Sequence, residues 1–589
     1  MARRSIWVAA ALAVLTVSGA ASAEDDWGNP PDESRDAGSS GQAERWEVPG
    51  VVVIDGRDDL SDADVKSLLA DVEAAFPDAT FQASDLEGET RIEVARVSPA
   101  ETSALVSRFG TDARVESAEP LSWIHASFVP NDPLYEKQWN MKRVGAESAW
   151  DYGTGRGVTV AVVDTGIACE DYEGFTKGTD LVGTRCVPGW NFIWDNDHAN
   201  DDQGHGSHVA GTIAQTTDNG VGVAGLAFGV SLMPVKVLDK RGWGTTLDVA
   251  NGIRWAGENG AQVVNLSLGG PQNSKVLQDA VDDTLARGVI IVAAAGNSGG
   301  AVGYPGGSAG VIGVSASDPN DKLAAFSSRG KEVDIAAPGV GVIQQTICEG
   351  GKNKCEIFPG WQGTSMASPH VAAAAALLVA QGVTDPVAVE KTLESTARDV
   401  DSSPSGRLKF GAGILDAGAA VKKVTFSHGL VRLALVGVLS ALAFAWARRS
   451  KSAAGAKVKG GIGYWIAALA AGPGLLFFAP LFLSRVHLGV DVLARPIADL
   501  DFYVGASLHR LLPLANAVVA FALMILTWHS KTLRKVAAGF SVGTAAYLVS
   551  LLALGETFPV FGTVALFAWC GLNAAACLFV ARTSLAETK

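Results

Sequence analysis

The chain has 589 residues, a formal net charge of −14 and a hydrophobic fraction of 48%. This length is too great for a single hydrophobic core, so several domains are expected. The acidic balance, and the lack of any basic run in the first 400 residues, argue against nucleic acid as a partner.

The N-terminus has the pattern of a secretory signal peptide. Arg3 and Arg4 precede an apolar run that ends in Ala-Ser-Ala at Ala23, where we expect cleavage. The segment 1–23 is too short for a mature spanning helix, so export is predicted. Residues 24–46 are acidic and rich in Pro, Gly and Ser, a composition that buries too little apolar surface to fold and therefore predicts a disordered leader.

Residues 47–127 predict a small α+β domain. Short runs rich in Val and Ile alternate with two amphipathic stretches, the first of which is capped by Ser61. We expect strands at 51–54, 90–97 and 115–124, and helices at 61–76 and 98–109.

Residues 128–422 alternate apolar strands with helices rich in Gly and Ala. This alternation predicts an α/β domain built on a doubly wound, mostly parallel sheet. The functional side chains of such sheets gather at the carboxyl ends of the strands, so residues that directly follow strands are the candidates for chemistry.

Residues 423–589 predict an all-α transmembrane bundle. Five apolar runs are long enough to cross a bilayer at about 1.5 Å per residue, and they lie at 430–447, 462–483, 511–528, 536–554 and 560–581. The connections 448–459 and 531–535 are basic, so the positive-inside rule places them and the C-terminus in the cytoplasm and the preceding domain outside. Arg432, at the outer end of the first run, does not fit this pattern.

Four short segments carry the chemistry. One strand ends at Asp164 before a Gly turn, and another ends shortly before Asn297. A small-residue helix starts at His205, and Ser365 opens a long Ala/Leu helix. A serine nucleophile needs a base, the base needs an orienting acid, and the oxyanion needs donors. Each residue alone has an ordinary structural role as a turn former, a cap or a hydrogen-bonded side chain.

In this order, and with their flanking sequences, the four segments resemble the subtilisin-like serine peptidases. The resemblance implies that Asp164 orients His205, that His205 acts as general base and then acid, and that Ser365 is the nucleophile. The side-chain amide of Asn297 and the backbone N–H of Ser365 would form the oxyanion hole. The resemblance covers residues 51–422 and nothing after them.

The resemblance also gives residues 47–127 a role. A small α+β domain in front of such a peptidase is similar to the family's inhibitory propeptide, which assists folding and then occupies the cleft. Cleavage is expected between Trp123 and Phe128, carried out in cis by Ser365. A small unrelated module is the alternative.

The family's strong calcium site implies a further set of residues. Calcium takes six to eight oxygen ligands, and the residues implied here are Asp132, Asp180, Thr217, Asn219, Val221 and Val223. An acid-rich loop is a second and weaker candidate, although such clusters are more often solvated than ligated; it contains Asp195, Asn196, Asp197, Asp201 and Asp202.

Substrate binding is expected between two walls. The segment around Ser267 matches the family's edge that pairs with an extended peptide by β-augmentation, and Gly303 aligns with the pocket floor. Without a side chain at that floor the pocket should be deep and uncharged, which predicts a large apolar residue before the cut. The first wall is Ser267, Leu268 and Gly269, the other wall is Ala294, Ala295 and Gly296, and the floor is Gly303.

Four cysteines fall in the exported part of the chain. Cys169 and Cys186 close a loop beside the Asp164 turn, and Cys348 and Cys355 close a short loop before the Ser365 segment. Because exported domains keep their cysteines oxidised, two disulfides are predicted.

Together these features predict an exported serine endopeptidase that is anchored in the cell membrane by several spans, is made as an autoprocessed zymogen and acts on protein or peptide substrates. An alternative makes the membrane region a sensor or transport component that the peptidase domain regulates. A third hypothesis, a catalytically inactive binding module, is opposed by the intact set of four candidate residues.

Overall fold

The structure, a computed structural model, describes residues 47–83, 91–122, 129–348, 357–449, 458–475, 496–498, 516–554 and 562–586. The predicted signal peptide, the acidic leader and the predicted processing segment lie outside these residues. The chain divides into two compact units whose boundary falls between Ser122 and Val129. We describe the two units separately.

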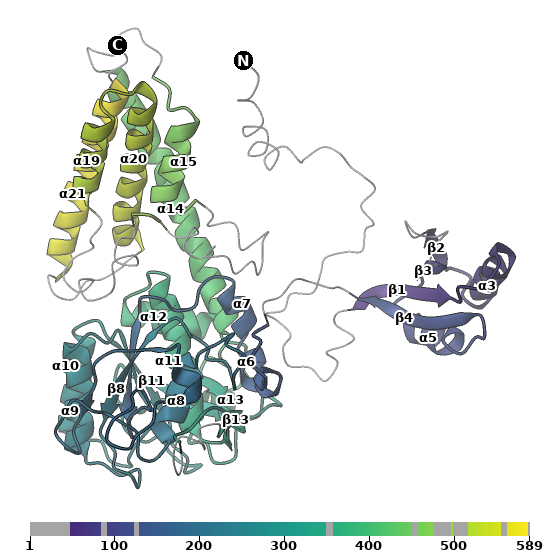
Figure 1. The fold of residues 1–589 in the computed structure, drawn as a ribbon, viewed down its shortest axis with the longest axis horizontal. Coiled ribbons are helices and arrows are strands. Elements are labelled where there is room, and N and C mark those ends of the chain that lie inside the picture. Colours follow the sequence, from purple (N-terminus) through teal and green to yellow (C-terminus); the bar gives the residue numbers. More distant parts are fainter. Residues whose placement is uncertain are drawn as a thin grey trace. The chain divides into compact units, whose positions relative to one another are not determined.

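The first unit is a four-stranded antiparallel sheet with the strand order β2-β3-β1-β4 and two helices (Figure 1). Its core joins Val52 and Ile54 of the sheet to Leu68 and Leu105 of the helices, so the predicted α+β arrangement is present. The strand β2 is an addition to the predicted elements. The elements are β1 (Glu47–Gly56), α3 (Asp62–Ala75), β2 (Thr80–Ala83), β3 (Ile92–Arg96), α5 (Thr102–Phe109) and β4 (Val115–Ser122).

The second unit is built on an eight-stranded sheet. Its strands run in the order β12-β11-β10-β9-β5-β8-β6, with β7 also paired to β8, and all these pairs are parallel. The predicted doubly wound sheet is confirmed. The strands are β5 (Thr159–Asp164), β6 (Arg185–Cys186), β7 (Trp190–Asn191), β8 (Ser231–Lys236), β9 (Val263–Leu266), β10 (Ile290–Ala294), β11 (Ile312–Ser317) and β12 (Ile335–Pro338), and β13 (Val342–Ile343) pairs separately with β14 (Gly360–Trp361).

Helices cover both faces of this sheet. In the central strand β5, Val160 and Val162 pack with α8 and α11, whereas Ala161 and Val163 face the layer of α9 and α10 (Figure 1). Because both faces are buried, the strands read as continuous apolar runs rather than alternating ones. The helices of this domain are α6 (Trp139–Arg143), α7 (Ala146–Trp150), α8 (His205–Ala214), α9 (Thr246–Glu258), α10 (Lys275–Leu285), α11 (Thr364–Ala380), α12 (Pro386–Thr396) and α13 (Pro404–Phe410), with 3-10 turns at Tyr135–Lys137 and Thr179–Leu181.

One long helix, α14 (Ala417–Arg448), belongs to two hydrophobic cores. Its first turns, including Val421 and Val424, pack into the core around the eight-stranded sheet, and later residues such as Val436 and Ala443 pack among the C-terminal helices. The predicted domain boundary at residue 422 therefore falls inside a continuous helix.

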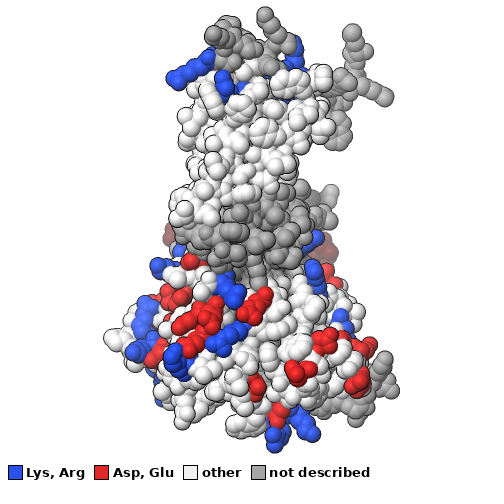
Figure 2. Space-filling model, turned by 90° about the vertical axis from the view of Figure 1, so that its left-hand side faces the viewer, with Lys and Arg blue, Asp and Glu red and all other residues white. Residues whose placement is uncertain are grey.

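Three described helices are long and apolar enough to span a membrane: α14, α20 (Lys531–Ala553) and α21 (Gly562–Ala586). Two shorter apolar helices, α15 (Ile462–Ala471) and α19 (Ala517–Thr527), occupy parts of the second and third predicted spans. The rest of those two spans lies mostly outside the described residues. On the face drawn in Figure 2, the described surface of these helices carries no charge along most of its length, and Lys and Arg gather at one end.

Arg432 has an internal partner. Its side chain is only 5% exposed and contacts α20, where its Nε donates to Ser550 Oγ at 3.1 Å and its guanidinium lies 5.1 Å from the ring centroid of Tyr547. A charged residue in an apolar helix is tolerated when it faces the bundle interior and finds such partners. The sequence alone did not show this placement.

Candidate active site

The carboxyl end of β5 places a buried carboxylate against the first residue of α8. Asp164 Oδ1 accepts hydrogen bonds from the Thr165 backbone N–H at 2.8 Å and from His205 Nδ1 at 2.7 Å. Asp164 is fully buried, whereas 22% of the His205 side chain is exposed. The contact fixes the neutral tautomer of His205, with its proton on Nδ1 and a free lone pair on Nε2.

The pKa of His205 reflects opposing influences. Burial lowers this pKa, but the negative charge and hydrogen bond of Asp164, with the charge of Asp201, outweigh burial and leave the pKa raised. His208, one turn further along α8, is fully buried and stacks on Trp361 with ring centroids 4.7 Å apart. Burial lowers the pKa of His208 to about 3, so this second histidine stays neutral and serves as a packed side chain.

Ser365 is the second residue of α11. Its hydroxyl donates to the main-chain oxygen of Ser267 at 2.9 Å, and the Ser267 hydroxyl donates back to the main-chain oxygen of Ser365 at 2.8 Å. This reciprocal pair holds the start of α11 against the end of β9. For the reaction the hydroxyl proton of Ser365 must turn from Ser267 toward His205 Nε2, and catalytic hydrogen bonds often align only when substrate binds.

Asn297 and the backbone N–H of Ser365 border one open space. The Asn297 side-chain oxygen accepts from the backbone N–H of Thr364 at 2.8 Å and from its hydroxyl at 2.9 Å, which leaves Nδ2 to donate elsewhere. A β carbon on Gly363 would lie 3.4 Å from Asn297 Nδ2 and 3.6 Å from the Ser365 nitrogen. Two donors thus converge where a glycine leaves room. Thr364 was not among the predicted site residues, although a hydroxyl beside Ser365, the predicted nucleophile, was a visible signal.

A cavity of about 470 Å³ opens beside His205. Three predicted residues of the first wall, Ser267, Leu268 and Gly269, line it together with several apolar side chains, including Leu238, Val249, Leu277 and Tyr304. Trp243, 74% exposed, also lines it and was missed because a single Trp in a Gly-rich loop carries no periodic signal.

The second predicted wall and the predicted floor, Gly303, lie outside this cavity's lining. Gly303 donates its backbone N–H to Ala295 at 2.9 Å, and a β carbon on Gly303 would lie 3.0 Å from the Gly270 oxygen. The Gly296 backbone N–H donates to the Thr364 hydroxyl at 3.1 Å, so this wall adjoins Asn297, to which Thr364 is bonded. Ala294 is the last residue of β10. Gly303 therefore sits where three segments approach closely.

The predicted calcium residues come together in one loop cluster. Asp132 accepts from the backbone N–H groups of Asp218 and Asn219 at 2.8 and 3.2 Å, and the Asn219 amide donates to Asp180 at 2.7 Å. Val223 donates its backbone N–H to Asp180 at 3.0 Å, Val221 donates to the Asn219 side-chain oxygen at 2.7 Å, and the Thr217 hydroxyl donates to the Gln215 backbone oxygen at 3.0 Å.

This cluster fits a hard cation. Asp132 and Asp180 are buried, and burial raises the pKa of Asp180 to about 7 and raises that of Asp132. A divalent ion would stabilise two buried carboxylates that are linked through one asparagine. If the Asn219 side chain turned its amide oxygen toward the ion, all of the side-chain ligands would be oxygen atoms.

The acid-rich loop is used internally. Asp202 forms an ion pair with the fully buried Lys236 at 2.6 Å, and Asp201 accepts hydrogen bonds from Thr165 and from the start of α8. These two carboxylates therefore have protein partners, and the structure does not bring the loop together as a second calcium site among the residues it describes.

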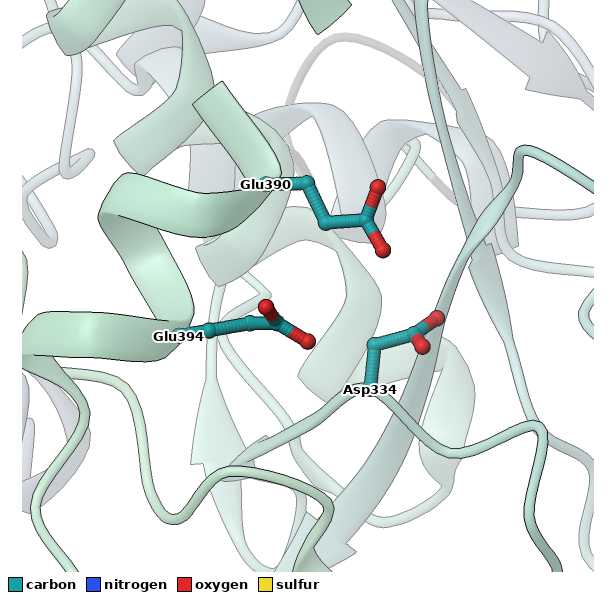
Figure 3. Close-up of side chains that lie close together, drawn as sticks. All are labelled: Asp334, Glu390 and Glu394. Atoms are coloured by element: carbon teal, nitrogen blue, oxygen red, sulfur yellow. The ribbon is translucent and has the colours of Figure 1, made fainter. Parts of the chain in front are cut away.

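A different acidic cluster appears that the sequence did not indicate. Asp334, Glu390 and Glu394 place carboxylate oxygens within 4.8 Å of one another (Figure 3). Burial, and then the charges of the two glutamates, raise the pKa of Asp334 to about 7, while a hydrogen bond from the Gly313 backbone opposes that rise. Asp334 precedes β12 and the glutamates lie on α12, so only the fold reveals the cluster.

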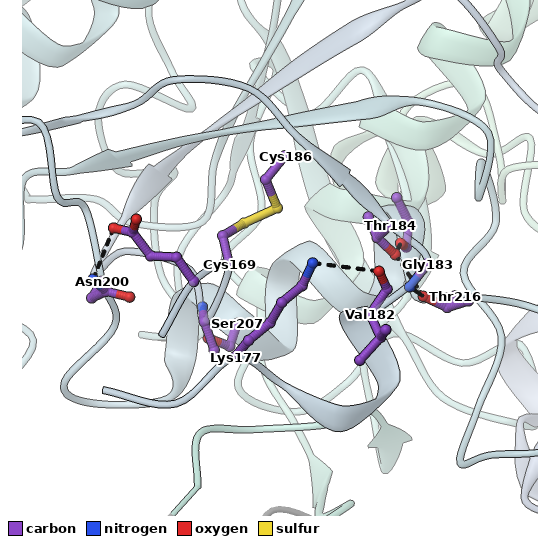
Figure 4. Close-up of a disulfide and its surroundings, with 12 residues drawn as sticks. Cys169, Lys177, Val182, Gly183, Thr184, Cys186, Asn200, Ser207 and Thr216 are labelled. Atoms are coloured by element: carbon purple, nitrogen blue, oxygen red, sulfur yellow. Dashed lines mark hydrogen bonds between the residues drawn. A yellow bond between two sulfur atoms is a disulfide. The ribbon is translucent and has the colours of Figure 1, made fainter. Parts of the chain in front are cut away.

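The Cys169–Cys186 disulfide is present and closes a loop with a sequence separation of 17 (Figure 4). Beside it, the Ala168 backbone N–H donates to Ser207 of α8 at 3.0 Å, so the bridged loop is tied to the helix that carries His205. The predicted Cys348–Cys355 bridge involves Cys355, which lies outside the described residues.

Comparison with known proteins gives a consistent answer. The profile of the subtilase family, peptidase S8, matches residues 155–413. Thermitase of Thermoactinomyces vulgaris is 39% identical over 257 residues, which cover 43% of this chain and 87% of that protein. Subtilisin DY of Bacillus licheniformis is 41% identical over 274 residues, covering 46% and 92%.

Among solved structures, a protease from Pseudoalteromonas arctica PAMC 21717 shares 33% identity over 50% of this chain and 100% of that chain, with a TM-score of 0.45. The family profile and the two curated relatives all match the part of the chain that forms the eight-stranded sheet and its helices. The chain belongs to the subtilase family of serine peptidases.

Proposed function

We propose that this protein is a serine endopeptidase in which Asp164, His205 and Ser365 form the catalytic triad and Asn297 supplies the side-chain donor of the oxyanion hole. The observation that supports this most is the 2.7 Å contact between His205 Nδ1 and Asp164 at the carboxyl edge of the sheet where α11 presents Ser365. Family membership makes the reaction class, hydrolysis of peptide bonds, the expected one.

The mechanism follows from these positions. Ser365 Oγ attacks the scissile carbonyl carbon while His205 Nε2 takes the hydroxyl proton, and buried Asp164 stabilises the imidazolium that results. The negative charge on the former carbonyl oxygen is held by Asn297 Nδ2, by the Ser365 backbone N–H and by the positive end of α11. His205 then gives its proton to the leaving amine, and a water molecule repeats the sequence to release the acyl group.

Active-site labelling tests this assignment. A fluorophosphonate probe should react covalently with the wild-type protein and not with Ser365→Ala. Ser368→Ala serves as a control, because Ser368 lies one turn along α11 and its hydroxyl donates to Asn265 at 2.7 Å, away from the oxyanion donors. Labelling that persists in Ser365→Ala would refute the proposal.

The substrate class proposed is protein or peptide chains with a large apolar residue before the cut. Supporting features are the side-chain-free position Gly303, close to Gly270 and Ala295, and the apolar cavity that Leu268 and Tyr304 line beside His205. Peptides that differ only by Phe or Arg at that position measure the preference. A higher kcat/KM for the Arg peptide would contradict it.

The first unit is proposed to be an inhibitory propeptide, and the protein a zymogen that Ser365 processes between Trp123 and Phe128. The four-stranded sheet with two helices, which precedes the peptidase domain in the sequence, supports this role. Ser365→Ala should accumulate as an unprocessed precursor in immunoblots. Mature-sized protein from that variant would show that another protease makes the cut.

The C-terminal helices are proposed to anchor the protein in the cell membrane, with the peptidase outside and the C-terminus in the cytoplasm. Support comes from the three long apolar helices and from exposed basic residues such as Arg448, Arg449, Lys459 and Lys531. A C-terminal tag should resist externally added protease in intact cells while the peptidase domain is degraded. The reverse pattern would overturn the orientation.

Calcium is proposed as a structural ion held by the oxygens of Asp132, Asp180 and Asn219 with loop carbonyls of Thr217, Val221 and Val223. When bound, it would neutralise two buried carboxylates and fix the loop that joins α8 to the sheet. It takes no part in the reaction steps.

A further inference from the structure

A second acid lies at the start of the helix that carries His205. The carboxylate of Asp201 is 2% exposed and accepts five hydrogen bonds. Its Oδ2 takes the backbone N–H and hydroxyl of Ser207, at 2.9 and 2.7 Å. Its Oδ1 takes the backbone N–H groups of Gln203 and Gly204, both at 2.9 Å, so Asp201 holds the N-terminal turn of α8 from both sides of His205.

The fifth bond links this turn to the catalytic strand. The Thr165 hydroxyl donates to Asp201 at 2.8 Å and accepts the backbone N–H of Gly206 at 2.9 Å. Thr165 directly follows Asp164 and donates its own backbone N–H to that carboxylate at 2.8 Å. A continuous hydrogen-bonded path therefore runs from Asp201 through Thr165 to Asp164, and it sets where His205 stands relative to Asp164.

The charge of Asp201 also acts on the imidazole. Asp164 is the larger influence from β5, and Asp201 adds a second negative charge from the loop before α8, which raises the pKa of His205 further. Among the described residues, the other groups around the ring add no positive charge that would cancel this. His208 is neutral, Trp361 faces His205 with ring centroids 6.4 Å apart, and Lys236 behind Thr165 is paired with Asp202.

We propose that Asp201 is a positioning residue for catalysis: a second buried carboxylate that aligns His205 with Asp164 through Thr165 and stabilises the imidazolium formed during the reaction. This inference rests on the proposed triad. It goes beyond the triad because Asp201 touches neither substrate nor reacting atoms, and its effect travels through the turn that it holds.

Three variants of the full-length protein test it. Asp201→Asn removes the charge with little change of shape. Asp195→Asn removes the same charge from an exposed position in the same loop and is the matched control. Thr165→Val keeps both carboxylates but breaks the path between them. For each variant, kcat and KM are measured against pH with a chromogenic peptide, and rates are divided by the active fraction titrated with a fluorophosphonate.

Loss of a nearby negative charge lowers the pKa of a histidine, so Asp201→Asn should move the acid limb of kcat/KM to lower pH by roughly half a unit. Its kcat should fall about tenfold with KM changed less than about twofold, as expected for a group that acts on the transition state. Thr165→Val should lose about tenfold in kcat with the acid limb unmoved, and Asp195→Asn should match wild type.

An unmoved acid limb in folded Asp201→Asn overturns the inference, and so does a wild-type kcat in Thr165→Val. If Asp201→Asn does not fold, the kcat of Thr165→Val alone tests the inference. Failure of the triad itself looks different, because the wild-type protein would then not react with the fluorophosphonate at Ser365.

Discussion

The side-chain oxygen of Asn297 accepts two hydrogen bonds from Thr364, one from the backbone N–H at 2.8 Å and one from the hydroxyl at 2.9 Å. These bonds leave the amide NH2 as the group that Asn297 presents to solvent or substrate. Thr364, the residue before the proposed nucleophile Ser365, thus sets the direction of the donor that we propose for the oxyanion hole.

Replacing Asn297 should therefore weaken stabilisation of the transition state more than it weakens substrate binding. We expect Asn297→Ala to lower kcat by about 10² to 10³ with little change in KM, because the amide acts on the oxyanion. Thr364→Val, which removes one of the two orienting bonds, should lose roughly tenfold. Steady-state kinetics check both, with exposed Asn320→Ala as a control expected to match wild type. A rise in KM at constant kcat would contradict this account.

Gly363→Ala should inactivate the enzyme and also lower the stability of the fold, because Gly363 has a φ of +155°, a backbone conformation that residues with a side chain rarely adopt. The added methyl would stand 3.4 Å from Asn297 Nδ2 and 3.6 Å from the Ser365 nitrogen, in the space that we propose for the oxyanion. We expect kcat to fall by at least about 10², with unchanged circular dichroism. Gly360→Ala, on the same segment, meets nothing closer than 3.6 Å and should retain activity. Full activity in Gly363→Ala would place the oxyanion elsewhere.

Asp334→Asn should stabilise the protein at alkaline pH. The folded-state pKa of Asp334 is raised from 3.8 to about 7, so ionisation costs stability as pH rises through this interval. An asparagine keeps an acceptor for the Gly313 backbone N–H, 2.7 Å away, but carries no charge toward Glu390 and Glu394. We expect a gain of about 1 to 2 kcal/mol at pH 8 that vanishes near pH 4, measured by calorimetry at both pH values. An equal gain at both would point to packing instead.

Calcium removal should lower thermal stability. Binding to the folded state alone stabilises it by mass action, so an excess of chelator should reduce the temperature of the peptidase transition by several degrees. In Asp180→Asn the difference between calcium and chelator should shrink, because a principal carboxylate is gone. Calorimetry of both proteins in both buffers makes the comparison. If the wild-type protein has the same transition temperature with calcium and with chelator, the proposal that this site binds calcium is wrong.

The parts of the site that the sequence predicts are those whose signal is local. Asp164 ends an apolar run, His205 follows a Gly-containing turn and Ser365 opens an alanine helix, so strand-end and helix-start patterns identify each one. Contacts between residues that are far apart in the sequence leave no such local pattern. The Asp334 cluster joins residues more than fifty positions apart, and Arg432 appears misplaced until α20 supplies Ser550 and Tyr547.

The weak edge strand β2 was missed for a related reason. Thr80–Ala83 is only four residues long, and its pairing with β3 decides its conformation more than its own composition does. Short strands of this kind depend on tertiary contacts, which a single sequence does not display.

The junction between the catalytic core and the apolar helices is the continuous helix α14 and not an exposed loop. Proteases cut mainly at exposed loops and termini. A packed helix must first unfold locally before its chain can enter the active site of a protease. Val424 on one side and Val436 on the other oppose that opening. Proteolytic separation of the catalytic domain from the C-terminal helices is therefore disfavoured, and we expect the two parts to persist and be degraded as one molecule.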